Sequence, residues 1–341
     1  MKFLVPILSF VALCAGDEIP MIPGDNSHYI EGVSRYFWIP DGNGVPILVD
    51  THDDADLDLA SRRSGSDNNQ YWLFTRKNPT TAQKLVNGDL NSVSSSNYVA
   101  TKPLLVISHG WRSNGKSDVN TMISYAALDA DDINVIVLDW NKEAGKFNYF
   151  ASVPSVPEVG KYLGNFLVWL IKNTRGNWNK VHLVGHSLGA HVVGNAGRQT
   201  GGLPARITAL DPAKPKWSDN PNKITKTDGV YVEAIHTDGG RLGIKDAIGN
   251  ADFYPNGGES PQPGCRWLSL SPCSHTRAYQ LFASTVQNNQ HVGKKCSSVG
   301  DASKGKNCSG PSLRMGNNIL SKRGSGIYYL TTTDMYPYYK K

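Results

Sequence analysis

The sequence has little of several features that mark common protein classes. Its 35 Lys and Arg against 29 Asp and Glu leave a formal net charge of only +6, and no stretch interleaves basic with aromatic residues, so we expect no nucleic acid partner. The apolar run at residues 3–13 is too short to span a bilayer. No cluster of His, Cys and Asp has the spacing of metal ligands, so we expect no metal and no other cofactor.

Cysteine is scarce, with five in the chain. Cys14 lies in a positively charged and then apolar start that ends in small residues, which predicts a signal peptide over residues 1–16 and a secreted, extracellular protein. An even number remains after its removal, and in a secreted protein this indicates disulfides. The pattern of the residues alone allows three pairings among Cys265, Cys273, Cys296 and Cys308.

The organisation of the chain indicates one α/β domain. Residues 17–35 are polar and lack periodicity, which predicts an arm or a propeptide with Arg35 as a candidate cleavage point, and residues 36–341 hold enough apolar content for one core. Residues 156–173 form an amphipathic helical pattern between strand signals, as a crossover helix does. We therefore predict a mostly parallel sheet with helices on both faces. Strands are expected at residues 71–75, 103–108, 134–140, 181–185, 207–210 and 230–235.

Residues 181–197 read VHLVGHSLGAHVVGNAG and are the most informative stretch. An apolar strand turns through GxSxG into a helix of small residues, and this pattern predicts a nucleophile elbow carrying Ser187. The turn brings strand and helix backbones together, so a Cβ at Gly185 or Gly189 would press against its neighbours. A serine hydroxyl needs such exposure, beside a base and free N–H groups, to become a nucleophile.

The acid of this arrangement follows the serine in chain order. Asp211 ends the apolar segment 205–210 just before Pro212, which places it at the carboxyl edge of the predicted sheet, where sites in open α/β sheets form. We therefore assign it as the acid. The remaining candidates lie in polar or Gly-rich segments that are typical of solvated loops, namely Asp219, Asp228, Asp238, Asp246 and Asp252.

The base is sought beyond Asp211, among His236, His275 and His291. His236 ends a strand-like run, where a satisfied core histidine is expected. His275 follows Cys273 and precedes a helical pattern, so a loop anchored by a disulfide would hold it, and we assign it as the base.

The oxyanion of an acyl-transfer intermediate needs N–H donors. The backbone of Leu188 supplies the first in folds with this elbow, and the loop after the strand at residues 103–108 supplies the second. In that loop we assign the backbone N–H of Trp111, and we expect the side chains of His109 and Trp111 to be structural.

Seven motifs in a fixed order resemble the animal pancreatic lipase family of α/β-hydrolases. They are SHGW at 108–111, VLDW at 137–140, GHSLGAH at 185–191, ITALDPA at 207–213, IHTDGG at 235–240, ADFYPNGG at 251–258 and CSHTRAY at 273–279. The resemblance implies an α/β-hydrolase fold and carries Ser187, Asp211 and His275 onto the family's triad. Together with proximity in sequence, it favours Cys265 pairing with Cys273 and Cys296 with Cys308.

Departures from the long-chain lipases of that family concern the substrate. The family's lid is closed by a disulfide, and here it encloses only residues 266–272, while the loop at 239–250 is also short. Short loops resemble the insect-type neutral lipase and phospholipase A1 branch, which implies cleavage of the first acyl ester of a phospholipid. The alternatives are a triacylglycerol or galactolipid lipase and a non-catalytic lipid-binding or yolk-type protein. The lid residues are Cys265, Trp267, Leu268, Leu270 and Cys273.

The resemblance also bears on partners. The chain ends at Lys341, which leaves no room for the family's C-terminal β-sandwich, so we expect no colipase and a monomer that acts at a membrane or micelle interface. In the segment 219–228, where the family places a structural calcium, Asp228 is the one residue that looks like a ligand, beside Lys223 and Lys226, so calcium binding is in doubt.

Overall fold

The structure is a computed structural model that describes residues 22–52, 67–146, 148–265 and 273–339. The signal peptide predicted over residues 1–16 lies outside the described residues. Three of the predicted lid residues, Trp267, Leu268 and Leu270, lie outside them as well.

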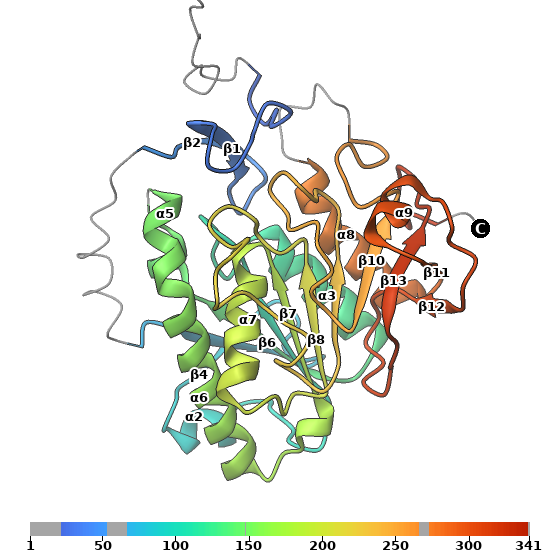
Figure 1. Cartoon of the computed structure of the whole chain (residues 1–341). Helices are drawn as coiled ribbons and strands as arrows, with labels where there is room; N and C mark the ends of the chain where they lie inside the picture. Colours follow the sequence, from blue (N-terminus) through green and yellow to red (C-terminus); the bar gives the residue numbers. More distant parts are fainter. Residues whose placement is uncertain (1–21, 53–66, 147, 266–272, 340–341) are drawn as a thin grey trace, which may run out of the picture.

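A large central sheet organises the chain, with strand order β12-β11-β13-β10-β9-β8-β7-β5-β6-β3-β4 (Figure 1). From β13 to β6 the neighbouring strands are parallel, and antiparallel strands flank them at both edges. The parallel strands are β5 (Leu104–Ser108), β6 (Asn134–Asp139), β7 (Val181–His186), β8 (Arg206–Leu210), β9 (Val232–Ile235), β10 (Ala251–Pro255) and β13 (Gly326–Leu330). The antiparallel strands are β3 (Gln70–Phe74), β4 (Gln83–Leu85), β11 (Val292–Cys296) and β12 (Ser312–Arg314).

The central strands are buried on both faces, which explains why their sequences are nearly continuous apolar runs. Every residue of β5 and β6 is buried, as in LLVIS and NVIVLD. Helices α6 (Val156–Thr174) and α7 (Leu188–Gln199) pack together over one face, and α3 (Asp118–Ala130) and α8 (Cys273–Asn288) pack together over the other. Shorter helices are α2 (Leu90–Ser94), α4 (Asn141–Ala144), α5 (Tyr149–Ser152) and α9 (Val299–Lys304), with 3₁₀ turns at Val153–Ser155 and Trp178–Lys180.

A separate hairpin of β1 (Tyr36–Pro40) and β2 (Pro46–Asp50) lies beyond the carboxyl ends of the parallel strands (Figure 1). Phe37 of β1 is buried and contacts Tyr149 edge-to-face, with ring centroids 5.9 Å apart, and Tyr29 packs on the same ring. The hairpin is thereby anchored to the body through an aromatic cluster.

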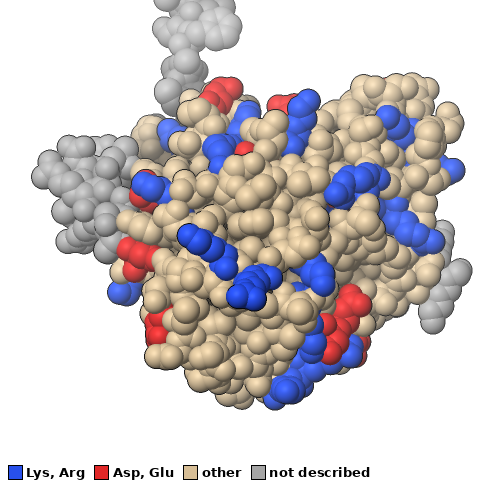
Figure 2. Space-filling model, turned by 90° about the horizontal axis from the view of Figure 1, so that it is seen from below, with Lys and Arg blue, Asp and Glu red and all other residues tan. Residues whose placement is uncertain are grey.

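The predicted fold is confirmed: the chain has the α/β-hydrolase fold, with a mostly parallel sheet covered on both faces. Each predicted strand is found with ends shifted by two residues or fewer. In the described residues, no helix combines the length and apolar character needed to cross a bilayer. Figure 2 shows Lys and Arg in several separate groups on the underside rather than in one continuous patch.

Two expectations about local structure were wrong. Asp228, Asp238 and Asp252 are buried rather than solvated: Asp228 accepts hydrogen bonds from Arg198, Asp238 follows β9 close to Asp211, and Asp252 lies within β10. The helix expected to start after His275 begins at Cys273, so this histidine lies in the first turn of α8.

Candidate active site

Ser187 lies at the turn between β7 and α7, in a backbone conformation that is rare for a residue with a side chain. Its φ is 58° and its ψ is −124°, the strained geometry of a nucleophile elbow. A Cβ on Gly185 would overlap the carbonyl of Gly189, and a Cβ on Gly189 would overlap the carbonyl oxygen of Ser108. The predicted role of both glycines in close backbone approach is therefore confirmed.

Asp211 follows β8 directly, at the carboxyl edge next to the elbow. Its carboxylate is fully buried, and its Oδ1 accepts hydrogen bonds from the N–H groups of Thr237 at 2.8 Å and Asp238 at 3.0 Å. Its Oδ2 accepts the hydrogen of His275 Nδ1 across 2.6 Å. Backbone donors and the imidazole together satisfy a charge that burial would otherwise disfavour.

His275 is 1% exposed, and its Nε2 has no hydrogen-bond partner among the described residues. Nε2 is therefore available, because the bond to Asp211 fixes the hydrogen on Nδ1. The N–H of His186 Nε2 donates to the carbonyl of His275 across 3.0 Å, which holds the backbone of that helical turn. Burial, and then the neighbouring His275, lower the pKa of His186 well below its usual value, so it stays neutral.

A narrow cavity of about 20 Å³ joins these groups. Its lining includes Gly110, Trp111, Ser187 and His275, so the predicted serine, base and oxyanion loop meet at one opening. No hydrogen bond links the Ser187 hydroxyl to His275 among the described residues, and such bonds are often long in proteins without substrate. The volume is about that of one water molecule, so these groups converge on a confined space.

The N–H groups of Leu188 and Trp111 donate no hydrogen bond to a described residue. Leu188 is the first residue of α7, where the helix leaves its N–H groups without internal partners. As predicted for a structural side chain, the Trp111 indole is buried and donates to the carbonyl of Lys146 across 3.0 Å. Two backbone N–H groups thus stay available beside Ser187.

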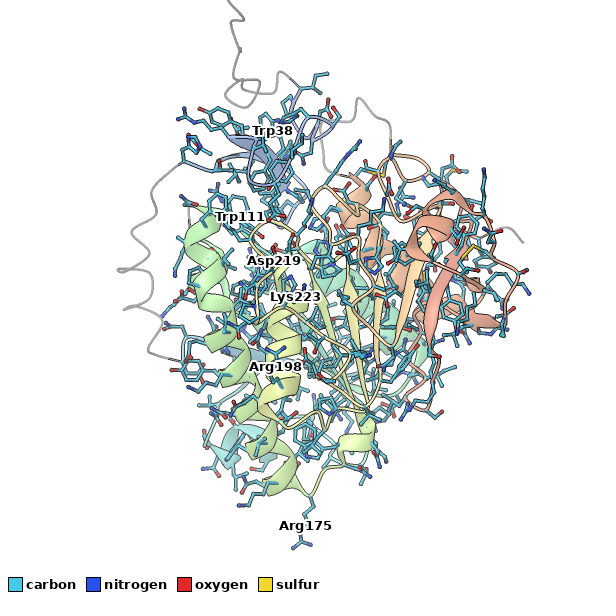
Figure 3. The ribbon with its side chains drawn as sticks, viewed as in Figure 1. Trp38, Trp111, Arg175, Arg198, Asp219 and Lys223 are labelled. Atoms are coloured by element: carbon cyan, nitrogen blue, oxygen red, sulfur yellow. A yellow bond between two sulfur atoms is a disulfide. The ribbon has the colours of Figure 1, made fainter. Side chains whose placement is uncertain are left out.

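The hairpin of β1 and β2 supports the loop that contains Trp111. The N–H of Gly42 donates to the carbonyl of Arg112 across 3.0 Å, and the N–H of Asp118 donates to the carbonyl of Gly42 across 3.4 Å. A Cβ on Gly42 would lie 2.8 Å from the Cα of Ser113, so the fit excludes a side chain. Figure 3 shows Trp111 below the hairpin that carries Trp38.

Asp238 is a site residue that sequence reasoning missed. It is 4% exposed, and its carboxylate lies with the polar atoms of Asp211 and His275 in a group no wider than 4.8 Å. Burial, and then the charge of Asp211, raise the pKa of Asp238 to about 7. Its position three residues after β9 is the signal that could have identified it, because β9 ends at the same edge as β8. A shared cation is disfavoured here, since the bond between Asp211 and His275 uses the atoms that would bind it.

The other two histidine candidates are placed elsewhere. His236 is buried, with Nε2 3.0 Å from Asp252 Oδ1 and Nδ1 2.7 Å from the carbonyl of Ile244, which confirms the expected core histidine with satisfied nitrogens. His291 packs edge-to-face against Tyr339 and does not line the cavity of Ser187.

In the segment 219–228, where the family places a structural calcium, Asp228 is bonded to an arginine. Both oxygens of Asp228 accept hydrogen bonds from Arg198, at 3.2 Å each, and one also accepts the N–H of Thr225. Lys223 lies nearby and donates to the carbonyl of Ser218; Figure 3 shows Asp219, Lys223 and Arg198 along the side of α7. A donor set already neutralised by a guanidinium does not fit calcium.

Both favoured disulfides are present. Cys265 pairs with Cys273 across a sequence separation of 8, and Cys296 pairs with Cys308 across 12. Cys273 begins α8, so the first bond ties the predicted lid to the helical turn that carries His275.

The sequence was compared with protein families and with known proteins. The family model described as Lipase matches residues 47–338. Lipase member H of Danio rerio is 34% identical over 256 residues, covering 70% of this chain and 55% of that protein. Pancreatic triacylglycerol lipase of Mus musculus is 32% identical over 257 residues, covering 68% of this chain and 54% of that protein. The chain thus spans about half the length of these curated relatives.

Among solved structures, an acetyl xylan esterase from Aspergillus awamori aligns with a TM-score of 0.32 and 12% identity, covering 52% of this chain and 70% of that one. The match of the family model extends over most of the sequence and includes both ends of the large sheet. The chain therefore belongs to the lipase family, as its resemblance to the pancreatic lipases predicted.

Proposed function

We propose that this chain is a secreted serine hydrolase that cleaves an acyl ester of a glycerolipid, with the first acyl position of a phospholipid as its preferred target. Membership of the lipase family supports ester hydrolysis. The site supports a serine mechanism, because a strained serine lines one cavity with the histidine of a buried acid–histidine pair, and the N–H groups of Leu188 and Trp111 are available beside that serine.

In the proposed mechanism, His275 Nε2 takes the proton of the Ser187 hydroxyl as its oxygen attacks the ester carbonyl. Asp211 keeps the hydrogen of His275 on Nδ1 and stabilises the imidazolium that forms. The N–H groups of Leu188 and Trp111 donate to the oxyanion, and each such donor is typically worth a factor of about 10²–10³ in turnover. His275 then protonates the leaving alcohol, and the acyl-enzyme on Ser187 is hydrolysed by water that His275 activates.

The observation that carries the proposal is the bonding of the two nitrogens of His275. Nδ1 donates to Asp211 across 2.6 Å, while Nε2 is unpartnered in the residue that lines the cavity with Ser187. His236, in contrast, has both ring nitrogens bonded and does not line this cavity.

Preference for phospholipid rests on the short loop closed by Cys265 and Cys273. A loop of this length cannot form a long amphipathic flap, and a polar head group can then approach the cleft. Secretion is supported by the two disulfides, which persist in oxidising compartments, and by the predicted leader.

A fluorophosphonate probe tests the serine chemistry. We expect labelling of the intact protein, loss of labelling in Ser187→Ala, and an unchanged melting temperature in that variant, because the elbow depends on its glycines. An intact protein that takes no label would favour the non-catalytic lipid-binding alternative.

Substrate class is tested by comparing rates on micellar phosphatidylcholine and emulsified triacylglycerol, with positional analysis of the released acid. Phosphatidylcholine should be the faster substrate. Equal or faster turnover of triacylglycerol would favour the triacylglycerol lipase alternative over phospholipase A1 activity. A separate assay on galactolipid tests the galactolipid lipase alternative.

A further inference from the structure

A second and much larger cavity lies between α3 and the part of the sheet formed by β3 and β6. Its volume is about 780 Å³, within the range of pockets that hold small ligands. None of its lining residues lines the cavity of Ser187. Its lining includes Trp72, Phe74, Arg76, Lys116, Thr121 and Leu128.

The walls of this pocket are largely apolar. Trp72 and Phe74 lie two residues apart on β3, so their side chains project to the same face of the sheet. Val137 of the neighbouring strand β6 pairs with Trp72. Leu128 of α3 lines the pocket with them, and both aromatic rings stay partly exposed. Partly exposed aromatic rings in a concave apolar site favour binding of an apolar ligand.

The pocket follows α3 from before its first residue to its last turn. A helix advances about 1.5 Å per residue, so the stretch from Asn120 to Leu128 covers about 12 Å. This shape fits an extended single chain better than a ring system. On the α3 wall, Asn120 Oδ1 and Ser124 Oγ are buried without a hydrogen-bond partner among the described residues. Buried polar atoms usually have such a partner.

The charges at the two ends of the pocket differ. At the far end Arg76 donates to the backbone carbonyls of Leu128 and Asp129, so two hydrogen bonds already hold its guanidinium group against α3. At the near end Lys116 is exposed and has no ion pair or hydrogen bond through its ammonium group within the described part of the chain. Lys116 also lies between Ser113 and Val119, which line the cavity of Ser187.

We propose that this pocket binds a fatty acid, with its carboxylate at Lys116 and its acyl chain along Trp72, Phe74 and Leu128. An elongated, largely apolar pocket with an unpaired cation at one end is complementary to that amphiphile. The identification of this ligand as the acid released at the neighbouring cavity rests on the proposed function; the binding site itself does not.

The test is a calorimetric titration of the full chain carrying Ser187→Ala with laurate, at laurate concentrations below the micellar one. This variant cannot turn over lipid, so the result is independent of the proposed hydrolysis. We expect one laurate per chain. Thr121→Trp should fill the pocket from an exposed helix position and lower the affinity by about tenfold.

Met122→Trp is the matched control, because it places the same bulk at the next residue of α3, which is exposed and does not line the pocket. It should bind laurate as the parent does. Equal binding by Thr121→Trp and Met122→Trp would overturn the assigned site, as would the absence of any stoichiometric binding.

The head group is tested with Lys116→Ala, using Lys172→Ala as the control for loss of an exposed charge. Lys116→Ala should weaken laurate about two- to fivefold, as expected for an exposed ion pair, and leave 1-dodecanol unaffected. Equal weakening of acid and alcohol, or no change, would overturn the carboxylate assignment. The two proposals can fail separately. If Ser187→Ala binds laurate but the intact protein takes no fluorophosphonate label, the proposed function is refuted and the fatty-acid site is retained.

Discussion

Oδ2 of Asp211 lies 2.6 Å from Nδ1 of His275, although the two residues are 64 positions apart in the chain. The chain contains a second buried acid–histidine pair, Asp252 and His236, at 3.0 Å. The pairs differ in the other ring nitrogen, which is bonded to Ile244 in His236 and unpartnered in His275. In the proposed mechanism, that difference separates the pair that moves a proton from the pair that stabilises the fold.

Asp211→Asn should therefore lower kcat by a factor of about 10⁴ while the protein stays folded, because an amide cannot hold His275 in the productive tautomer. Steady-state hydrolysis of a soluble ester, together with circular dichroism, measures both effects.

Asp252→Asn is the matched control, since it alters the same kind of pair outside the cavity. Its melting temperature should fall, because Asp252 also accepts the N–H groups of Ile248 and Gly249, while kcat changes far less. A comparable loss of kcat in both variants would mean that the Asp211 effect is structural.

The carboxyl of Asp238 should make stability depend on pH. Its pKa is raised from 3.8 to about 7, so between these values the folded chain binds more protons than the unfolded chain. The contribution of this protonated carboxyl to the free energy of unfolding is fully present below about pH 4 and is lost as the pH rises toward 7. Asp238→Asn removes this loss, and its melting temperature should exceed that of the parent by more at pH 8 than at about pH 5. A constant difference would contradict the raised pKa.

Glu233 of β9 forms ion pairs with two buried cations, Arg206 and Lys322. Its carboxylate accepts hydrogen bonds from Arg206 and Lys322, and all three side chains are buried. Glu233→Gln leaves two buried cations without their counter-ion and should cost about 3–5 kcal/mol of unfolding free energy. Lys322→Met leaves one matched pair and should be near neutral. Urea unfolding measures both, and a larger loss in Lys322→Met would refute this account.

Gly189→Ala should prevent folding or lower the melting temperature strongly, because the new methyl group overlaps backbone of the β5 segment. Gly300→Ala is the comparison, since its Cβ meets nothing closer than 3.7 Å within helix α9. That variant should gain about 0.5–1 kcal/mol from higher helix propensity. Thermal unfolding by circular dichroism separates the two, and similar melting temperatures would show that the elbow tolerates a side chain.

The sequence predicted the elbow and its partners because each rule rests on local chemistry. Glycines at 185 and 189, an acid directly after a buried strand and a fixed chain order needed no knowledge of distant contacts. Asp238 was missed because burial is set by tertiary structure: the loop after β9 returns over the sheet edge, and composition alone indicated solvent. The place of β13 between β10 and β11 was likewise hidden, since strand order in a sheet is not written in any one strand.

The hairpin and the second pocket lay beyond sequence reasoning for a related reason. Gly42 is an ordinary turn residue in the sequence, and its hydrogen bonds with Arg112 and Asp118 join segments about 70 residues apart. Lys116 and Trp72 are similarly unremarkable until α3 packs beside β3.

The contact of Gly42 with the loop after β5 also bears on the order of events during synthesis. The hairpin leaves the ribosome before the residues that receive it, since chains emerge from the N-terminus onward. It can dock only once the segment from Arg112 to Asp118 has been made and positioned. The wall of the candidate site that lies nearest the start of the polypeptide is thus completed only after the segment that it contacts has been made.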